Sequence, residues 1–225
     1  MSGYGQFCPI AKTSEILGER WTNLIVRELG AGSESFNDLR RGLPRISPSL
    51  LSSRLKFLED AGVLARAETS KGVRYTLTEA GRELKPIILQ MGVWGHRWAR
   101  SKLTRDDLDP SMLMWDIHRT MNAGYFVEHL TTLHFEFSDY AAKFRRWWLV
   151  IRDGDVDVCM KDPGHDIDLE ILTDVRTLTG VWMGDIRLGQ ALRDNRIRLA
   201  GPMQLKRDIS TWLGRNYFAD VKPAK

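Results

Sequence analysis

Small polar and cationic side chains gather in the segment 47–56. Ser49, Ser52, Ser53 and Lys56 share one helix face, with Arg54 on its flank and Ser47 as the helix cap. Leu51, Leu55 and Leu58 repeat at helical spacing, so they mark the buried side of that helix. Short hydroxyl side chains let a helix backbone approach base edges, and long cations reach phosphates or guanine. The pattern favours a helix in the major groove of DNA, although a plain amphipathic surface helix would present a similar face.

The segments around this helix follow the order of a helix-turn-helix. Apolar spacing predicts helices over 10–17 and 20–29. Ser35 and Asp38 have the spacing of a capping box at the start of a third helix. Glycine and proline then interrupt the chain, and Pro48 suits the first position of the fourth helix, where its missing N–H costs nothing. This order predicts a unit whose later helix contacts DNA.

A β-hairpin is predicted directly after the fourth helix. The β-prone runs 63–67 and 73–77 flank a polar, glycine-containing turn over 68–72. Such a hairpin completes a winged helix-turn-helix. Lys71 at the tip and Arg74 on the return strand are candidate contacts to the DNA backbone or minor groove, although a lysine at a hairpin tip is common.

A fifth helix begins after Thr78 and carries an apolar stripe. The stripe consists of Leu84, Ile87, Met91, Trp94 and Trp98. An apolar stripe on a helix that leaves the wing needs a partner. The first helix or a second domain would serve, but we favour a second copy of the chain, because half-site recognition usually requires a two-fold pair.

Composition and charge support a soluble, nucleic-acid-binding chain. The 225 residues are 43% hydrophobic and 28% charged, as in ordinary globular proteins. Residues 1–100 hold 15 Lys and Arg against 10 Asp and Glu, whereas residues 101–225 hold 18 against 19, so only the first half suggests a polyanionic partner. No membrane-length apolar run or secretory signal is visible, and two cysteines make no disulfide framework. We therefore expect a cytoplasmic protein.

Several motifs between about residues 7 and 100 agree with one family. They are Cys8-Pro9, Leu17-Gly18-Glu19-Arg20-Trp21, Phe36-Asn37-Asp38-Leu39, Ile46-Ser47, Leu51, Arg54-Leu55, Leu58, Gly62, Tyr75 and Leu77-Thr78. In these motifs the chain resembles the HxlR-type bacterial winged-helix regulators. The resemblance implies a homodimeric, DNA-binding transcription regulator whose fourth helix enters the major groove and whose terminal helices form the dimer. We expect a repressor of a pseudo-palindromic operator, because a bound dimer blocks polymerase by occupancy alone.

The cysteine at the start of this region has two interpretations. Some regulators that this chain resembles use the matching N-terminal cysteine as a thiol redox sensor. Cys8 is therefore a candidate redox site, with Lys12 four residues further along the chain. A small, buried structural residue is the alternative.

The second half predicts a separate α+β domain with a mainly antiparallel sheet. Residues 1–100 form the DNA-binding and dimerisation domain, 101–109 a charged linker, and 110–225 the second domain. Within it we expect a helix over 110–122, strands over 131–137, 147–151, 156–160 and 167–172, helices over 174–183 and 187–193, a short strand over 197–199, and a last helix over 202–213.

Part of this domain resembles the sterol carrier protein type 2 fold. The likeness covers about residues 125–215 and is carried by the segment 162–201, which reads DPGHDIDLEILTDVRTLTGVWMGDIRLGQALRDNRIRLAG. It implies a sheet and helices around an apolar cavity. Candidate lining residues are Trp115, Phe135, Trp148 and Trp182. An apolar small-molecule effector is one hypothesis, but large aromatic side chains more often fill a core, which would make the domain structural.

Signals for catalysis and for metal binding fail on inspection. Asp153, Asp155 and Asp157 begin like a calcium loop, but Val158 and Gly164 stand where the loop needs glycine and glutamate. The histidines form no metalloprotease pattern, and nucleophile or phosphate-binding motifs are missing. We predict no enzyme, no metal and no cofactor.

The alternatives to a DNA-binding regulator are a lipid-like small-molecule carrier and a protein–protein adaptor.

Overall fold

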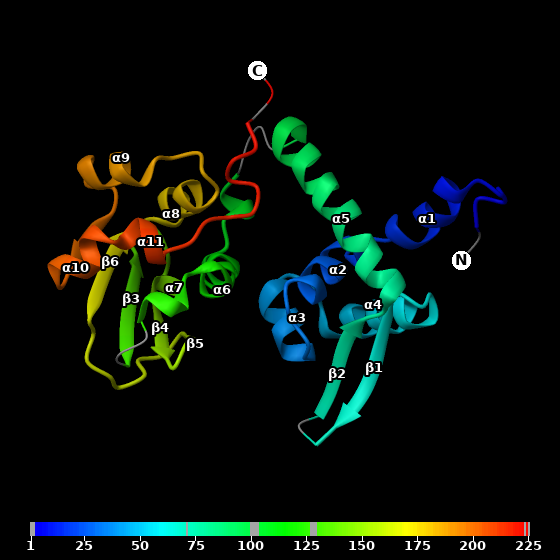
Figure 1. Cartoon of the computed structure of the whole chain (residues 1–225), viewed down its shortest axis with the longest axis horizontal. Coiled ribbons are helices and arrows are strands. Elements are labelled where there is room, and N and C mark those ends of the chain that lie inside the picture. Colours follow the sequence, from blue (N-terminus) through cyan, green and yellow to red (C-terminus); the bar gives the residue numbers. More distant parts are fainter. Residues whose placement is uncertain (1–2, 71, 100–103, 127–129, 223, 225) are drawn as a thin grey trace. The chain divides into compact units, whose positions relative to one another are not determined.

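The computed structural model describes residues 3–70, 72–99, 104–126, 130–222 and 224. The chain divides into two compact units, 1–95 and 96–225 (Figure 1). Each unit has its own hydrophobic core. The described part of the predicted linker contains a short 3-10 helix over Arg105–Asp107. None of the described helices is long and apolar enough to span a membrane.

The N-terminal unit is a winged helix-turn-helix, as the sequence predicts. Its elements are α1 (Pro9–Leu17), α2 (Thr22–Gly30), α3 (Phe36–Gly42), α4 (Pro48–Asp60), β1 (Leu64–Thr69), β2 (Gly72–Leu77) and α5 (Glu79–Trp94), followed by a π-helix over Gly95–Ala99 (Figure 1). Leu51, Leu55 and Leu58 of α4 are buried in the core of this unit. The face of α4 that the leucine spacing assigns to the core is therefore confirmed.

Local side-chain caps fix where these helices begin. Ser35 Oγ accepts a hydrogen bond from the Asp38 amide at 3.1 Å, and the Asp38 carboxylate accepts one from the Ser35 amide at 3.3 Å. Ser47 Oγ caps α4 by accepting from the Leu50 amide at 3.3 Å, with Pro48 at the first helical position. The predicted capping box and the predicted start of α4 are both confirmed.

Two predicted boundaries in this unit are wrong. Helix α2 begins at Thr22 rather than at residue 20, because Trp21 has a left-handed backbone with φ of 80°. The hairpin strands run further than predicted, since Thr69 pairs with Gly72 although both lie inside the turn expected over 68–72. Gly72 permits this tight turn by adopting φ of +110°.

The C-terminal unit is built on a five-stranded mixed sheet. Its strands are β3 (Thr131–Phe137), β4 (Arg146–Arg152), β5 (Asp155–Cys159), β6 (Leu169–Thr173) and β7 (Arg198–Ala200). They lie in the order β5-β4-β3-β6-β7, and only β3 and β6 run parallel. The predicted α+β class with a mainly antiparallel sheet is confirmed.

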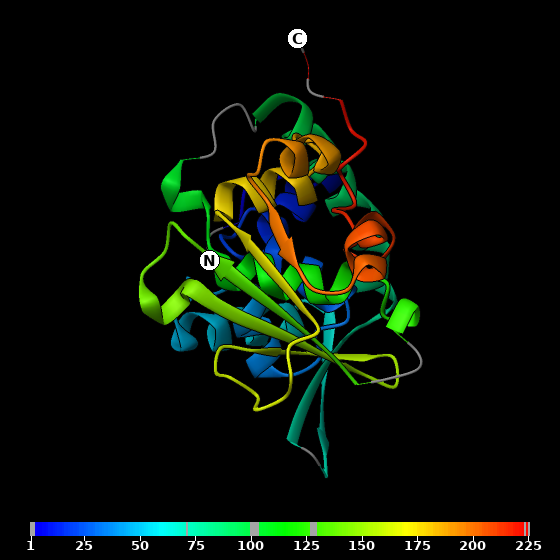
Figure 2. The ribbon, with the colours of Figure 1, turned by 90° about the vertical axis from the view of Figure 1, so that its left-hand side faces the viewer.

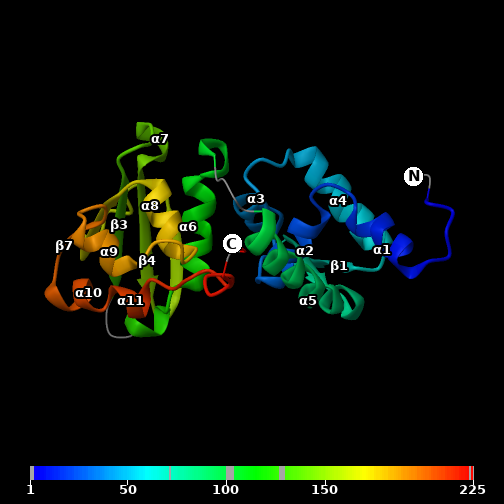
Figure 3. The same ribbon diagram turned by 90° about the horizontal axis from the view of Figure 1, so that it is seen from above.

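Helices cover one face of that sheet. They are α6 (Pro110–Thr120), α7 (Ala142–Arg145), α8 (Val175–Trp182), α9 (Leu188–Arg193), α10 (Met203–Arg207) and α11 (Ile209–Trp212), with a 3-10 turn over Ala123–Phe126. Strand residues Leu133, Phe135 and Phe137 face Met114 of α6 and Trp212 of α11 in one core. Figure 2 shows the strands in front of α6, and Figure 3 shows the same layers from above.

The predicted helices at the two ends of this unit are too long. The helix expected over 110–122 ends at Thr120, because Met121 has an extended backbone. The helix expected over 202–213 is divided into α10 and α11 at Asp208. There the Tyr125 hydroxyl donates to the Asp208 carboxylate at 3.0 Å, a contact across 83 residues that no local pattern reveals.

Candidate nucleic-acid interface

The outer face of α4 presents a row of hydroxyl groups beside a lysine. Ser49, Ser52, Ser53 and Lys56 are all exposed, on the side opposite the buried leucines. Ser47 is exposed at the start of the helix, and its Oγ lies 3.3 Å from Ser49 Oγ. These side chains are short enough for the helix backbone to approach another surface closely. The structure thus brings five of the predicted contact residues onto one accessible surface, here called the α4 polar face.

Lys56 carries the positive charge of the α4 polar face. Its Nζ lies 2.7 Å from Asp60 Oδ1 and 3.7 Å from Glu59 Oε2, and its side chain is 68% exposed. The hydrogen bond to Asp60 raises the pKa of Lys56, so the amine stays protonated. Exposed ion pairs of this kind are weak, so a phosphate group can replace the carboxylate as the partner of Lys56.

Arg54 has a different environment from Lys56. Its Nη2 lies 2.6 Å from Glu19 Oε2, and its Nε donates to the Arg20 carbonyl at 3.0 Å. Only 17% of the side chain is exposed. The guanidinium group is therefore directed at the turn between α1 and α2 and lies apart from the α4 polar face.

The wing supplies one described candidate contact. Arg74 is about half exposed, and its Nη2 lies 2.5 Å from Glu34 Oε1. That hydrogen bond raises the pKa of Arg74. Lys71, the other predicted wing contact, lies outside the described residues. Arg66 on β1 was missed by the sequence reasoning. It is exposed, and its Nη2 lies 3.1 Å from Glu68 Oε1. The only sequence signal for this residue is a cation on a predicted wing strand.

Further cations lie where the chain enters α4. Arg40 and Arg41 end helix α3, and Arg45 stands two residues before the α4 cap, all three exposed. Arg41 lies 3.5 Å from Asp38. The sequence reasoning left these arginines out of the predicted interface. The concentration of cations in the turn before the helix cap is the sequence signal that could have identified them.

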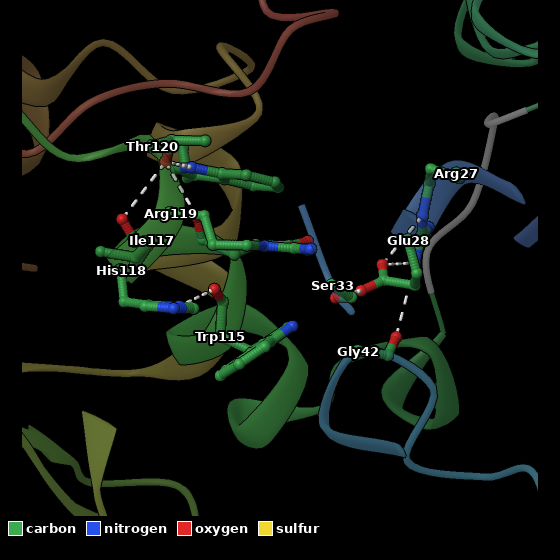
Figure 4. Close-up of polar contacts among 11 residues, drawn as sticks. Arg27, Glu28, Ser33, Gly42, Trp115, Ile117, His118, Arg119 and Thr120 are labelled. Atoms are coloured by element: carbon green, nitrogen blue, oxygen red, sulfur yellow. Dashed lines mark hydrogen bonds and ion pairs between the residues drawn. The ribbon is translucent and has the colours of Figure 1, made fainter. Parts of the chain in front are cut away.

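A buried carboxylate holds the helices behind this surface. Glu28 of α2 is fully buried, with Arg27 Nη2 2.8 Å from Oε1 and Ser33 Oγ 3.2 Å from Oε2 (Figure 4). Arg27 also donates to the Gly42 carbonyl at 3.4 Å. A Cβ at Gly42 would lie 1.9 Å from Glu28 Oε2, so any larger residue would have to displace this buried carboxylate. This cluster fixes the end of α3, and sequence spacing gave no signal for it.

The apolar stripe after the wing is divided between core and surface. Leu84 packs against the core of the N-terminal unit. Ile87, Met91 and Trp94 are exposed on α5, with Trp94 at 62%, and Trp98 is exposed in the π-helix. Exposed aromatic groups of this size are typical of surfaces that bind another protein.

Helix α1 adds to the exposed apolar surface. None of the described residues of α1 is buried, and Ile10 and the neighbouring Phe7 are largely exposed. Cys8 occupies the N-cap position of α1 with a half-buried thiol. Its redox role stays a prediction.

The four residues predicted to line a pocket in the C-terminal unit do not come together. Phe135 and Trp182 belong to the core between sheet and helices. Trp148 lies on the opposite face of the sheet, stacked on His134 at 5.0 Å, because side chains alternate along a strand. Trp115 lies on α6 outside that core, with Arg119 above its ring at 5.5 Å (Figure 4). Within the described ranges, no three His, Cys, Asp or Glu side chains form a metal-binding group.

Fold and surface together define the N-terminal unit as a winged helix-turn-helix, and comparison with known proteins places it in a family. A model of the HxlR-like helix-turn-helix family matches residues 16–103. The HTH-type transcriptional regulator YvaP of Bacillus subtilis is 38% identical over 112 residues, which cover 48% of this chain and 95% of YvaP. The chain therefore belongs to the HxlR-like helix-turn-helix family.

A second relative has the same description. The HTH-type transcriptional regulator YodB of Bacillus subtilis is 35% identical over 95 residues, covering 40% of this chain and 85% of YodB. The solved structure of reduced YodB matches at 33% identity and a TM-score of 0.36, covering 40% of this chain and 92% of that one. Both relatives are HTH-type transcriptional regulators, and the chain is a helix-turn-helix transcriptional regulator of their family.

Proposed function

We propose that the chain acts as a homodimer that binds a pseudo-palindromic DNA site and represses transcription there. The observation that carries the proposal is the α4 polar face, where Ser49, Ser52, Ser53 and Lys56 are exposed together. Two such helices, related by a two-fold axis, would enter successive major grooves. The serines would approach base edges, Lys56 would contact a phosphate, and Arg74 of the wing would contact the neighbouring backbone.

The exposed apolar surface supports the homodimer. Ile87, Met91 and Trp94 follow one another along α5 without entering the core of their own unit. A second copy would cover each stripe with the same stripe, as a two-fold interface requires. Because a repressor works by occupying its site, dimerisation and DNA binding suffice for this activity.

Selection from a library of random DNA duplexes tests the proposal. We expect the purified chain to enrich a sequence with two inverted half-sites about one helical turn apart. Sedimentation should give a dimer in the absence of DNA. A promoter carrying the enriched site should lose transcription in vitro when the protein is added. A library that yields a single, asymmetric half-site would refute the dimeric mode, and increased transcription would refute repression.

A second hypothesis rests on the sequence resemblance alone: control by an apolar small molecule bound to the C-terminal unit. That unit lies beyond the family match at 16–103 and forms a core of its own from sheet and helices. An effector would change DNA affinity only if it bound the DNA-competent and DNA-incompetent states differently. Titration of fatty acids and aromatic acids against tryptophan fluorescence, followed by DNA binding at saturation, tests this. Unchanged DNA affinity with every compound would reject it.

A further inference from the structure

Arg54 links the recognition helix α4 to the turn that follows α1. Its Nη2 lies 2.6 Å from Glu19 Oε2, and its Nε donates to the Arg20 carbonyl at 3.0 Å. One planar guanidinium group thus holds a carboxylate and a carbonyl of the same turn. The side chain is largely buried, whereas Ser52, Ser53 and Lys56 on the same helix are exposed.

The turn that Arg54 holds has an unusual backbone. Trp21 has φ of 80° and ψ of −20°, a left-handed conformation that is a true outlier for a bulky residue. Such a conformation persists only when surrounding contacts impose it, and outliers of this kind cluster where function depends on them. Here Thr22 is fully buried and its amide donates to the Glu19 carbonyl at 3.2 Å. Asn23 donates to the Leu17 carbonyl at 3.1 Å.

The position of this turn gives the link its importance. It connects α1, whose described residues are all at least partly exposed, with the core helix α2. The Arg54 contacts therefore join the α1–α2 turn directly to the helix that carries the α4 polar face, across 34 residues of sequence.

We propose that Arg54 is a positioning residue that sets the direction of α4, and that it makes no contact with DNA phosphate. The pair of Arg54 and Glu19 would hold α4 against the α1–α2 turn, so that the serines and Lys56 meet the groove in one orientation. The inference rests on the proposed DNA binding, because positioning matters only if α4 is the DNA-contacting helix.

Glu19→Gln distinguishes positioning from direct contact by the sign of its effect. If Arg54 contacted phosphate, loss of the Glu19 charge would free the guanidinium group and remove an anion, and DNA would bind more tightly. If Arg54 positions α4, Glu19→Gln weakens the link, and DNA affinity should fall by roughly fivefold, the size of coupling between contacting residues. Tighter binding by Glu19→Gln would overturn the proposal.

The salt dependence of Arg54→Ala gives a second readout. A lost phosphate contact lowers the slope of log affinity against log salt concentration by about 1, as expected for Lys56→Ala. A positioning residue leaves the slope at its wild-type value while the affinity falls. Arg54→Lys should bind about as weakly as Arg54→Ala, because an ammonium group cannot hold the carboxylate and the carbonyl in one plane. A reduced slope in Arg54→Ala, or wild-type affinity in Arg54→Lys, would overturn the proposal.

Hydrogen exchange of the full-length protein without DNA separates this inference from the proposed function. Glu19→Gln should raise amide exchange in the α1–α2 turn and in α4, Arg54→Ala should raise it further because the contact with the Arg20 carbonyl is also lost, and the double variant should match Arg54→Ala. Lys56→Ala is the matched control and should leave exchange in the α1–α2 turn unchanged. Additive effects of the two substitutions, or no effect, would overturn the link whether or not the protein binds DNA. If the wild-type protein bound no DNA while the two substitutions still had non-additive effects on exchange, the proposed function would be refuted and the link would stand.

Discussion

The polar face of α4 and the polar row of β3 both lie opposite apolar side chains, but only the first is exposed. On α4, Ser52 and Ser53 face away from the buried leucines and are accessible. On β3, Thr132 and His134 alternate with core residues, yet they are only 1% and 7% exposed. Both rows follow the periodicity of their element, so periodicity alone does not decide which polar row contacts solvent.

The two rows differ in their surroundings. His134 stacks on Trp148 of β4, and the Thr132 amide donates to the Asp168 carboxylate at 2.8 Å. On this face Thr132 Oγ1 and both ring nitrogens of His134 are buried and make no hydrogen bond within the described residues. The α4 polar face has remained accessible at the surface of its unit. An exposed row of small hydroxyl groups is therefore the surface on which a partner can act.

Placing the same charge on both rows should produce the largest effects and the sharpest contrast. Thr132→Glu buries a carboxylate close to Asp168, so we expect loss of about 3 kcal/mol or more of unfolding free energy. Ser53→Glu puts a negative charge on the α4 polar face, so DNA affinity should fall by roughly 100-fold or more through repulsion by phosphate. Urea unfolding and DNA titration of both variants measure this.

The matched controls are Thr132→Val and Ser53→Ala, which keep side-chain size without the charge. Thr132→Val should remain near wild type in urea unfolding, and Ser53→Ala should lose far less DNA affinity than Ser53→Glu. If Thr132→Glu left stability unchanged, the two polar rows would not differ in burial as described. If Ser53→Glu bound DNA normally, the α4 polar face would not be the DNA-binding surface.

A charge on the exposed stripe of α5 should have the next largest effect. Ile87→Glu places a carboxylate where we propose that a second copy packs, and like charges meet across a two-fold axis. We expect a monomer in sedimentation and a loss of DNA affinity of roughly 10- to 100-fold, because one half-site remains. Arg82→Gln, a charge change at an exposed position on another face of α5, is the control. A stable dimer of Ile87→Glu would move the interface away from this stripe.

Local order in this chain could be predicted from sequence, and contacts between distant segments could not. The caps by Ser35 and Ser47 depend on residues three positions away, so their spacing was sufficient. The contact of Arg54 with Arg20 spans 34 residues, and that of Arg74 with Glu34 spans 40. Nothing local shows the carboxylate that each of these arginines meets.

The same reasoning explains the failed pocket prediction. The alternation of β3 correctly placed Phe135 toward the core. It could not show that Trp148 pairs with His134 on the opposite face, because that depends on the register between β3 and β4. Register is fixed by the whole sheet rather than by either strand.

Removing the exposed cation of α4 should have a moderate effect confined to DNA binding. Lys56→Ala should weaken DNA affinity several-fold and lower the salt slope by about 1, as for one lost phosphate contact. Thermal unfolding should not change measurably, because Lys56 is exposed and its pairs with Asp60 and Glu59 are surface pairs. Lys56→Arg should retain the wild-type slope. An unchanged slope in Lys56→Ala would remove this residue from the interface.

The smallest expected effect tests the buried row of β3 through its histidine. Burial lowers the pKa of His134 below its ordinary value near 6.5, while Glu170, 4.0 Å from Nδ1, and Glu136 act in the opposite direction. The unfolded chain then binds a proton below about pH 6.5 that the folded chain does not bind. Stability should therefore fall as the pH drops from about 6.5 toward the lowered pKa, and it should be unaffected by this group above pH 7.

Two substitutions determine whether His134 causes that loss. His134→Phe removes the titrating group and keeps a ring to stack on Trp148, so its urea-unfolding free energy should decline less between pH 7 and 5 than that of the wild type. Glu170→Gln removes the carboxylate that raises the pKa of His134, so its decline should be steeper. Parallel pH profiles for all three proteins would show that His134 is not shielded from protons. The outer face of the sheet would then be open to solvent, as the α4 polar face is, and the contrast between the two rows would be lost.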